Sequence, residues 1–118
     1  MQIVERQVGD VVILDLVGKI LIGEGDDTLR ETVQKLIDEG KIKVVLNMVE
    51  VPYVDSAGMG EIVRCFTTIR KQAEKLEQGG RLKLLSLTKK IQDLLAITKL
   101  LTMFEVFDNE AEAIASFN

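Results

Sequence analysis

Residues 44–76 read VVLNMVEVPYVDSAGMGEIVRCFTTIRKQAEKL, and this stretch decides the fold. It begins with an apolar run over residues 44–48, which is typical of a strand buried on both faces of a parallel sheet. After a short loop, apolar residues recur at helical spacing and predict the longest helix of the chain. That stripe consists of Met59, Ile62, Val63, Phe66, Ile69, Ala73 and Leu76. A buried strand that leads into an amphipathic helix is the unit of an α/β fold.

The residues before this stretch predict a hairpin and a helix. Residues 3–8 and 11–17 are rich in β-branched side chains and flank Gly9-Asp10, which is a typical hairpin turn. The loop over residues 23–27 ends in aspartates suited to N-capping, and apolar residues at helical spacing follow it. We expect Gly40 to end this helix in the left-handed conformation.

The residues after the stretch continue the alternation. Gly79-Gly80 is expected to stop the long helix, and residues 82–87 predict a strand. Thr88 is expected to cap a short helix, and residues 104–107 predict a last strand. Asn109 is expected to cap a C-terminal helix. Strands that alternate with helices imply right-handed crossovers and parallel pairing.

The whole chain is therefore expected to form one α/β domain over residues 1–118. Its sheet is predicted to be mixed but mainly parallel, with the N-terminal β-hairpin as the antiparallel part and about four α-helices.

The residue inventory excludes most enzyme classes. The chain has no histidine, which rules out a Ser-His-Asp triad, a Cys-His pair and a histidine metal ligand within it. A single cysteine, Cys65, allows no internal disulfide and favours a reducing, cytoplasmic setting. Cys65 lies beside the apolar stripe, so we expect an inert thiol that is buried or half-buried.

Charge and hydropathy limit the partners. The formal net charge of −4 argues against nucleic acid or an anionic membrane surface as a partner. No apolar run approaches the ~18 residues that a membrane span needs. Residues 1–7 lack a basic segment followed by an apolar one, so we expect no signal peptide.

The junction between the buried strand and the long helix is the candidate site. Asp55 and Ser56 are expected at the start of the helix, where unpaired backbone amides and the helix dipole favour negative charge. A phosphate on Ser56 would meet suitable donors there. Gly58 and Gly60 would allow another molecule, or another part of the domain, to approach closely. The alternative is that Asp55 or Ser56 is only an N-cap and the glycines only permit packing.

Other chemistries fit the sequence less well. The residues around Ser56 do not form a Gly-x-Ser-x-Gly elbow, and no histidine base is available. The segment 58–60 lacks the lysine of a P-loop and the full dinucleotide fingerprint. Glu24, Asp26 and Asp27 lack the spacing of a calcium loop and are expected to cap the helix. We therefore predict no catalytic residue, no cofactor and no metal site.

The segment Val54-Asp55-Ser56-Ala57-Gly58-Met59-Gly60 resembles the phosphorylation-site signature of the STAS domain family, in particular the bacterial anti-sigma factor antagonists. That signature is a hydrophobic residue followed by Asp-Ser-(Ser, Thr or Ala)-Gly-(Leu or Met)-Gly. The hairpin start, Gly18-Lys19-Ile20 after the second strand, and the chain length extend the resemblance over the whole sequence. The acidic loop over residues 24–27 departs from the family pattern, so partner contacts there are not implied.

The resemblance implies a phosphorylation-controlled binding protein and not an enzyme. An unphosphorylated member binds an anti-sigma factor serine kinase, which releases a sigma factor; phosphorylation breaks the complex, and a serine phosphatase reverses the switch. Ser56 would be the phosphoacceptor, and Ala57 removes a rival hydroxyl. The partner-binding residues would be Val54, Asp55, Ser56, Ala57, Gly58, Met59 and Gly60. The expected state is a monomer or weak dimer. The alternative is an unphosphorylated STAS scaffold or an accessory subunit of a signalling complex or transporter.

Overall fold

In the computed structural model, which describes residues 1–118, five strands form one mixed sheet in the order β1-β2-β3-β4-β5. The strands are β1 (Gln2–Val8), β2 (Val11–Val17), β3 (Lys43–Glu50), β4 (Arg81–Leu85) and β5 (Val106–Phe107). The helices are α1 (Asp26–Asp38), α2 (Ser56–Leu76), α3 (Lys89–Ile97) and α4 (Glu110–Ala115). Only β1 and β2 pair antiparallel, and each later neighbour pairs in parallel. The predicted α/β domain with its N-terminal hairpin is confirmed.

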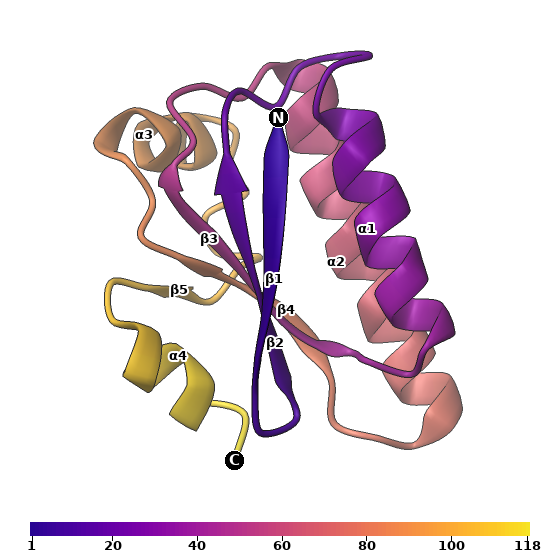
Figure 1. Ribbon diagram of the computed structural model, residues 1–118. Coiled ribbons are helices and arrows are strands. Elements are labelled where there is room, and N and C mark those ends of the chain that lie inside the picture. Colours follow the sequence, from indigo (N-terminus) through magenta and orange to yellow (C-terminus); the bar gives the residue numbers. More distant parts are fainter.

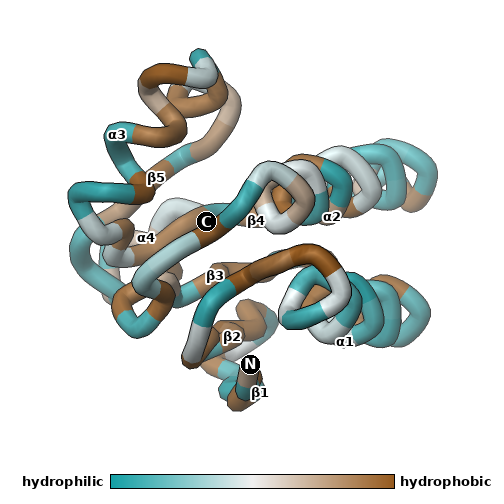
Figure 2. The backbone as a smooth tube through the Cα atoms, turned by 90° about the horizontal axis from the view of Figure 1, so that it is seen from above, coloured by the Kyte–Doolittle hydropathy of each residue, from teal (hydrophilic) through white to brown (hydrophobic).

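Helices cover both faces of the sheet. Figure 1 shows α1 and α2 side by side against one face, whereas α4 lies on the other and α3 lies beyond the end of β3. Figure 2 views the molecule from above and shows the pair α1 and α2 separated by the sheet from α3 and α4. None of the four helices combines the length and the apolarity that a bilayer span needs.

The alternation of side chains along the strands explains the two layers. Val12, Leu14 and Leu16 point into the large core beneath α1 and α2. Ile13 and Val45 point the other way and form a small core against α4. Since successive strand residues face opposite sides of a sheet, an unbroken apolar run is needed where both faces are covered.

Two helix ends differ from the predictions. The N-cap of α1 is Gly25, with φ 101°, and not an aspartate; Asp26 and Asp27 lie inside the first turn. Helix α2 ends at Leu76 because Glu77 adopts the left-handed conformation (φ 54°), so the predicted stop at Gly79-Gly80 was placed too late. The amides of Glu77 and Gln78 donate to the carbonyls of Glu74 and Ala73 at 3.2 and 3.0 Å, which closes the helix in a Schellman pattern without the usual glycine.

The remaining ends largely follow the sequence. Gly40 has φ 76°, and the amides of Gly40 and Lys41 donate to the carbonyls of Ile37 and Leu36 at 3.0 and 2.8 Å, a Schellman ending. Thr88 and Asn109 cap α3 and α4 as predicted.

The last two strands are shorter than predicted. Strand β4 ends at Leu85, because Ser86 has φ 58° and is no longer extended, although its amide still donates to the carbonyl of Phe107 at 2.7 Å. Strand β5 contains only Val106 and Phe107, while Phe104 is buried in the main core.

Candidate functional site

The loop after β2 and the loop after β3 meet at one end of the sheet. The amide of Ile20 donates to the carbonyl of Tyr53 at 3.1 Å, and the amide of Asp55 donates to the carbonyl of Ile20 at 3.2 Å. Both loops follow the carboxyl ends of parallel strands and lead into helices, so both helix starts lie at the top of Figure 1. In open parallel sheets this end is where ligands and partners are handled.

The Asp55 carboxylate accepts hydrogen bonds from both the β2–α1 loop and the start of α2. Its Oδ1 accepts from the amide of Gly58 at 2.7 Å, which is the N-cap bond of the helix. Its Oδ2 accepts from the amide of Ile22 at 3.0 Å. These amides, that of Gly58 first, lower the pKa of the Asp55 carboxyl below its ordinary value, because they stabilise its charged form.

Ser56 is the first residue of α2 and its side chain is exposed. Since Asp55 is the N-cap, the Ser56 hydroxyl is not required to begin the helix. A group attached to its Oγ would extend into solvent from the positive end of a 21-residue helix. Of the two residues that the sequence offered as the N-cap, the structure selects Asp55.

The two glycines of the motif have different surroundings. A Cβ on Gly58 would collide with the carbonyl oxygen of Ile20, so this glycine lets the β2–α1 loop lie against the helix. A Cβ on Gly60 would meet no atom within 4 Å, and Gly60 is exposed. Gly58 therefore serves the internal packing, and only Gly60 is available to an approaching molecule.

Two predicted contact residues are largely hidden. Val54 and Met59 are buried in the main core, whereas an apolar flank of a partner contact should expose its side chain. Both side chains are part of the main hydrophobic core, where burial of their apolar surface is favourable. They support the surface around Ser56 from below and form part of the floor of an adjacent groove.

This groove has a volume of about 560 Å³ and lies between the start of α2 and helix α3. Ser56 stands at its edge, and its apolar lining includes Val63, Ile91 and Leu94. Ile97, also on the lining, is 79% exposed. The groove was not predicted, because the sequence after Thr88 indicates a short helix but not that this helix lies beside the start of α2.

A buried carboxylate lies one turn further along α2. Glu61 is 6% exposed and pairs with Arg30 of α1 and Arg64 of α2, each at 3.1 Å. The Cys65 thiol donates to the same carboxylate at 3.4 Å. Burial and the nearby Glu61 charge raise the pKa of Cys65 well above its ordinary value, which agrees with the predicted inert thiol.

The acidic loop does not assemble a cation site. The carboxylates of Asp26 and Asp27 accept from the amides of Asp27 and Thr28, so they serve the first turn of α1. No three histidine, cysteine, aspartate or glutamate side chains anywhere in the chain are grouped to hold a metal ion.

The sequence pattern of the STAS domain family matches residues 2–113. The chain belongs to the STAS domain family. The segment from Val54 to Gly60, which resembles the phosphorylation-site signature of this family, runs from the end of the β3–α2 loop into the first turns of α2.

Solved structures share the whole STAS fold. A protein of Thermotoga maritima whose proposed role is anti-sigma factor antagonist is 26% identical, with a TM-score of 0.86 over 98% of this chain and 93% of that chain. The Bacillus cell fate determinant SpoIIAA, in its phosphorylated form, is 18% identical, with a TM-score of 0.69 over 99% of this chain and 100% of that chain.

A sulfate transporter family protein of Wolinella succinogenes is 22% identical, with a TM-score of 0.70 over 93% of this chain and 86% of that chain. No curated protein matches the chain significantly. At 18% and 22% identity, the likeness to SpoIIAA and to the Wolinella succinogenes protein shows the fold alone.

Proposed function

We propose that this STAS domain is an anti-sigma factor antagonist. Unphosphorylated, it binds an anti-sigma factor serine kinase and thereby frees a sigma factor; phosphorylation of Ser56 ends the complex, and a serine phosphatase restores it. The observation that carries the proposal is the exposed Ser56 side chain at the first position of α2, within the family motif. The protein is then a substrate and a binding partner, and not a catalyst.

The surface around Ser56 suits a protein partner. Ile22 is 75% exposed on the neighbouring loop, Ile97 is exposed on α3 across the groove, and Tyr53 is exposed on the loop that leads to Ser56. Apolar side chains that a monomer exposes near a common site gain free energy when a partner covers them. Gly60, with open space above it, allows a close approach to the helix.

Phosphorylation would reverse this preference. The Ser56 Oγ forms a bond to the γ-phosphorus of ATP as the bond to the β,γ-bridging oxygen breaks; ADP leaves and the hydroxyl proton is lost. The product carries about −1.5 to −2 charges where the partner would bury a neutral hydroxyl. An unpaired buried charge costs roughly 3 to 5 kcal/mol, which weakens binding by ~10²- to 10⁴-fold.

Likeness to known structures also supports this proposal. The Thermotoga maritima protein, which is 26% identical, has the same proposed role of anti-sigma factor antagonist. SpoIIAA, solved both unphosphorylated and phosphorylated, is 19% and 18% identical and shares the fold. The scaffold or transporter-accessory role has only the fold-level likeness to the Wolinella succinogenes protein behind it.

Phosphorylation by the cognate kinase tests the proposal. We expect incubation with the anti-sigma factor kinase and Mg-ATP to add one phosphoryl group, measured by intact mass. The addition should vanish in Ser56→Ala and persist in Thr102→Ala, which removes an exposed hydroxyl far along the chain. Phosphorylation that survives Ser56→Ala contradicts the site, and a protein that neither binds nor is modified by the kinase supports the scaffold role.

A further inference from the structure

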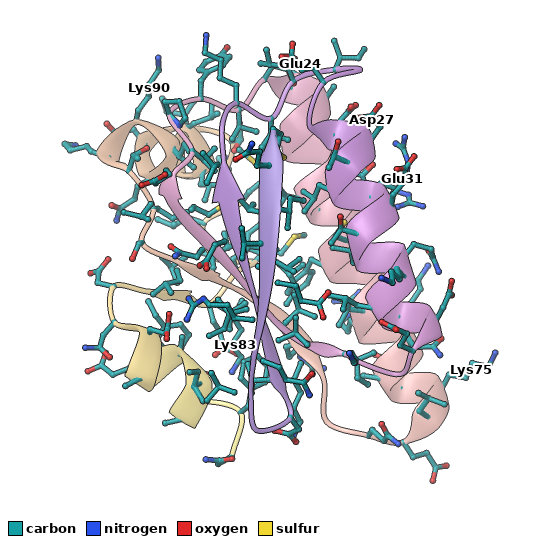
Figure 3. All side chains as sticks on the ribbon, viewed as in Figure 1. Glu24, Asp27, Glu31, Lys75, Lys83 and Lys90 are labelled. Atoms are coloured by element: carbon teal, nitrogen blue, oxygen red, sulfur yellow. The ribbon has the colours of Figure 1, made fainter.

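Lys90 is the only cationic residue among those that line the groove beside Ser56. It is exposed at the start of α3, and its Nζ lies 4.8 Å from the ring centroid of Tyr53. Figure 3 shows the Lys90 side chain at the same end of the molecule as Glu24, where the two loops meet. Tyr53 immediately precedes the motif, so this ammonium group is held beside the loop that carries Ser56.

The other charged side chains that line the groove are the carboxylates of Asp55 and Asp93. Asp93 pairs with Lys89 at 3.2 Å, one turn apart on α3. Asp55 is held in its charged form by the amides of Gly58 and Ile22. Lys90 is therefore the cation on the groove that contacts an aromatic face and no carboxylate.

A phosphate on Ser56 would need a counter-ion. It would stand next to the Asp55 carboxylate, which repels it and already accepts from the Gly58 amide. The helix dipole offers only partial positive charge. A flexible lysine whose present contact is a cation–π interaction gives up little when it turns to a dianion, since ion pairs with phosphate are stronger.

We infer that Lys90 is the internal counter-ion of phosphorylated Ser56. On phosphorylation its ammonium group leaves the Tyr53 ring and pairs with the phosphate, so that the ion pair lies across the mouth of the groove. This pairing rests on the proposed phosphorylation of Ser56. It adds a second barrier to partner binding, because the apolar groove is closed as well as charged at its edge.

The test uses protein with phosphoserine incorporated at position 56 during translation, so no kinase is needed. A phosphorus NMR titration gives the second pKa of that phosphate. We expect this pKa to be higher in Lys90→Gln than in the parent by roughly 0.2 to 0.7 pH unit, the size typical of an exposed ion pair. Lys89→Gln, the matched control, should leave it unchanged, because Lys89 pairs with Asp93.

Tyr53 provides a second readout. It is the only tyrosine and the chain has no tryptophan, so its ring resonances and fluorescence are unambiguous. Both should change on phosphorylation in the parent but not in Lys90→Gln.

An unchanged phosphate pKa in Lys90→Gln overturns the inference. So does an equal shift in Lys89→Gln, or a shift confined to Lys19→Gln on the β2–α1 loop. Since the phosphate is installed without a kinase, these outcomes leave the proposed function standing. Failure of the kinase experiment, in turn, leaves the Lys90 contact measurable.

Discussion

The carboxylate of Asp55 accepts a hydrogen bond of 3.0 Å from the amide of Ile22, 33 residues earlier in the chain. The same carboxylate caps α2 through Gly58. One side chain thus joins the β2–α1 loop, with its exposed Ile22, to the helix that presents Ser56. The Asp55 carboxylate thus adds a side-chain link to the two backbone hydrogen bonds that Ile20 forms with Tyr53 and Asp55.

Replacing Asp55 should loosen this junction. We expect Asp55→Ala to lower the melting temperature by roughly 3 to 6 °C, through loss of the cap, and Asp55→Asn to lower it less, because its amide oxygen can still accept. Amide hydrogen exchange should quicken at Ile22 in Asp55→Ala. Unchanged exchange at Ile22 would show that the loop is held by other contacts.

The Asp55 carboxyl also predicts a dependence on pH. Its pKa is lower in the folded protein than in the unfolded chain, so its stabilising effect is complete above the ordinary value of about 4 and disappears as the pH falls through the lower, folded value. Urea unfolding at a series of pH values should show the wild type losing its advantage over Asp55→Asn in acid. A gap between the two proteins that is constant from neutral to acidic pH contradicts this role.

Gly58→Ala and Gly60→Ala form a matched pair within one helical turn. The first places a methyl group against the Ile20 carbonyl and should destabilise the protein by about 2 kcal/mol or more, since backbone must move. The second places a methyl group in open space on the exposed side of α2 and should stabilise the protein by ~0.5 to 1 kcal/mol. Chemical denaturation measures both; equal effects would mean that the Ile20 contact is not limiting.

Arg30 and Arg64, which both pair with Glu61, should be energetically coupled. Arg30→Met or Arg64→Met alone leaves one partner for the buried carboxylate and should cost about 1 kcal/mol. The double variant leaves Glu61 buried and unpaired, so its cost should reach roughly 3 to 5 kcal/mol, more than the sum of the two. A double-mutant cycle by urea unfolding measures the excess, and simple additivity would argue that water reaches the carboxylate.

Cys65 should be inert in the native state. It is 1% exposed and its pKa is raised, so both access and thiolate formation are limited. An aromatic disulfide reagent at pH 8 should modify it only as fast as the protein opens, and at once in denaturant. Rapid modification of native protein would reveal a local opening of α2.

Ser56→Asp separates fold from function. An acidic residue at the first position of a helix is favourable to the dipole, so the melting temperature should hold or rise slightly. Binding to the anti-sigma factor kinase should nevertheless fall by at least ~10-fold, as titration calorimetry can measure. Loss of the fold instead would mean that Ser56 has a structural role after all.

Much of the architecture could be predicted because it follows from local patterns. The nearly continuous apolar run over residues 44–48, interrupted only by Asn47, is typical of a strand covered on both faces, and the sheet provides this. Gly40 and Thr88 mark helix ends by their own backbone and hydroxyl chemistry. The position of Ser56 at the start of α2 follows from the same kind of signal.

Two details that differ from the predictions could not be predicted from local patterns. Nothing near Glu77 in the sequence marks it as left-handed, yet α2 ends there. From the sequence, Val54 and Met59 were predicted to contact a partner, but in the structure both side chains are buried in the main core.

The sequence by itself determined the class of fold, the family motif and the place of Ser56 between a strand and a helix, since these depend on neighbours along the chain. Only the tertiary structure decided that Asp55 binds Ile22, that Glu61 is buried between two arginines, and that α3 forms a groove beside the motif. Those relationships arise when parallel strands bring separate loops to one end of the sheet, and no local pattern encodes them.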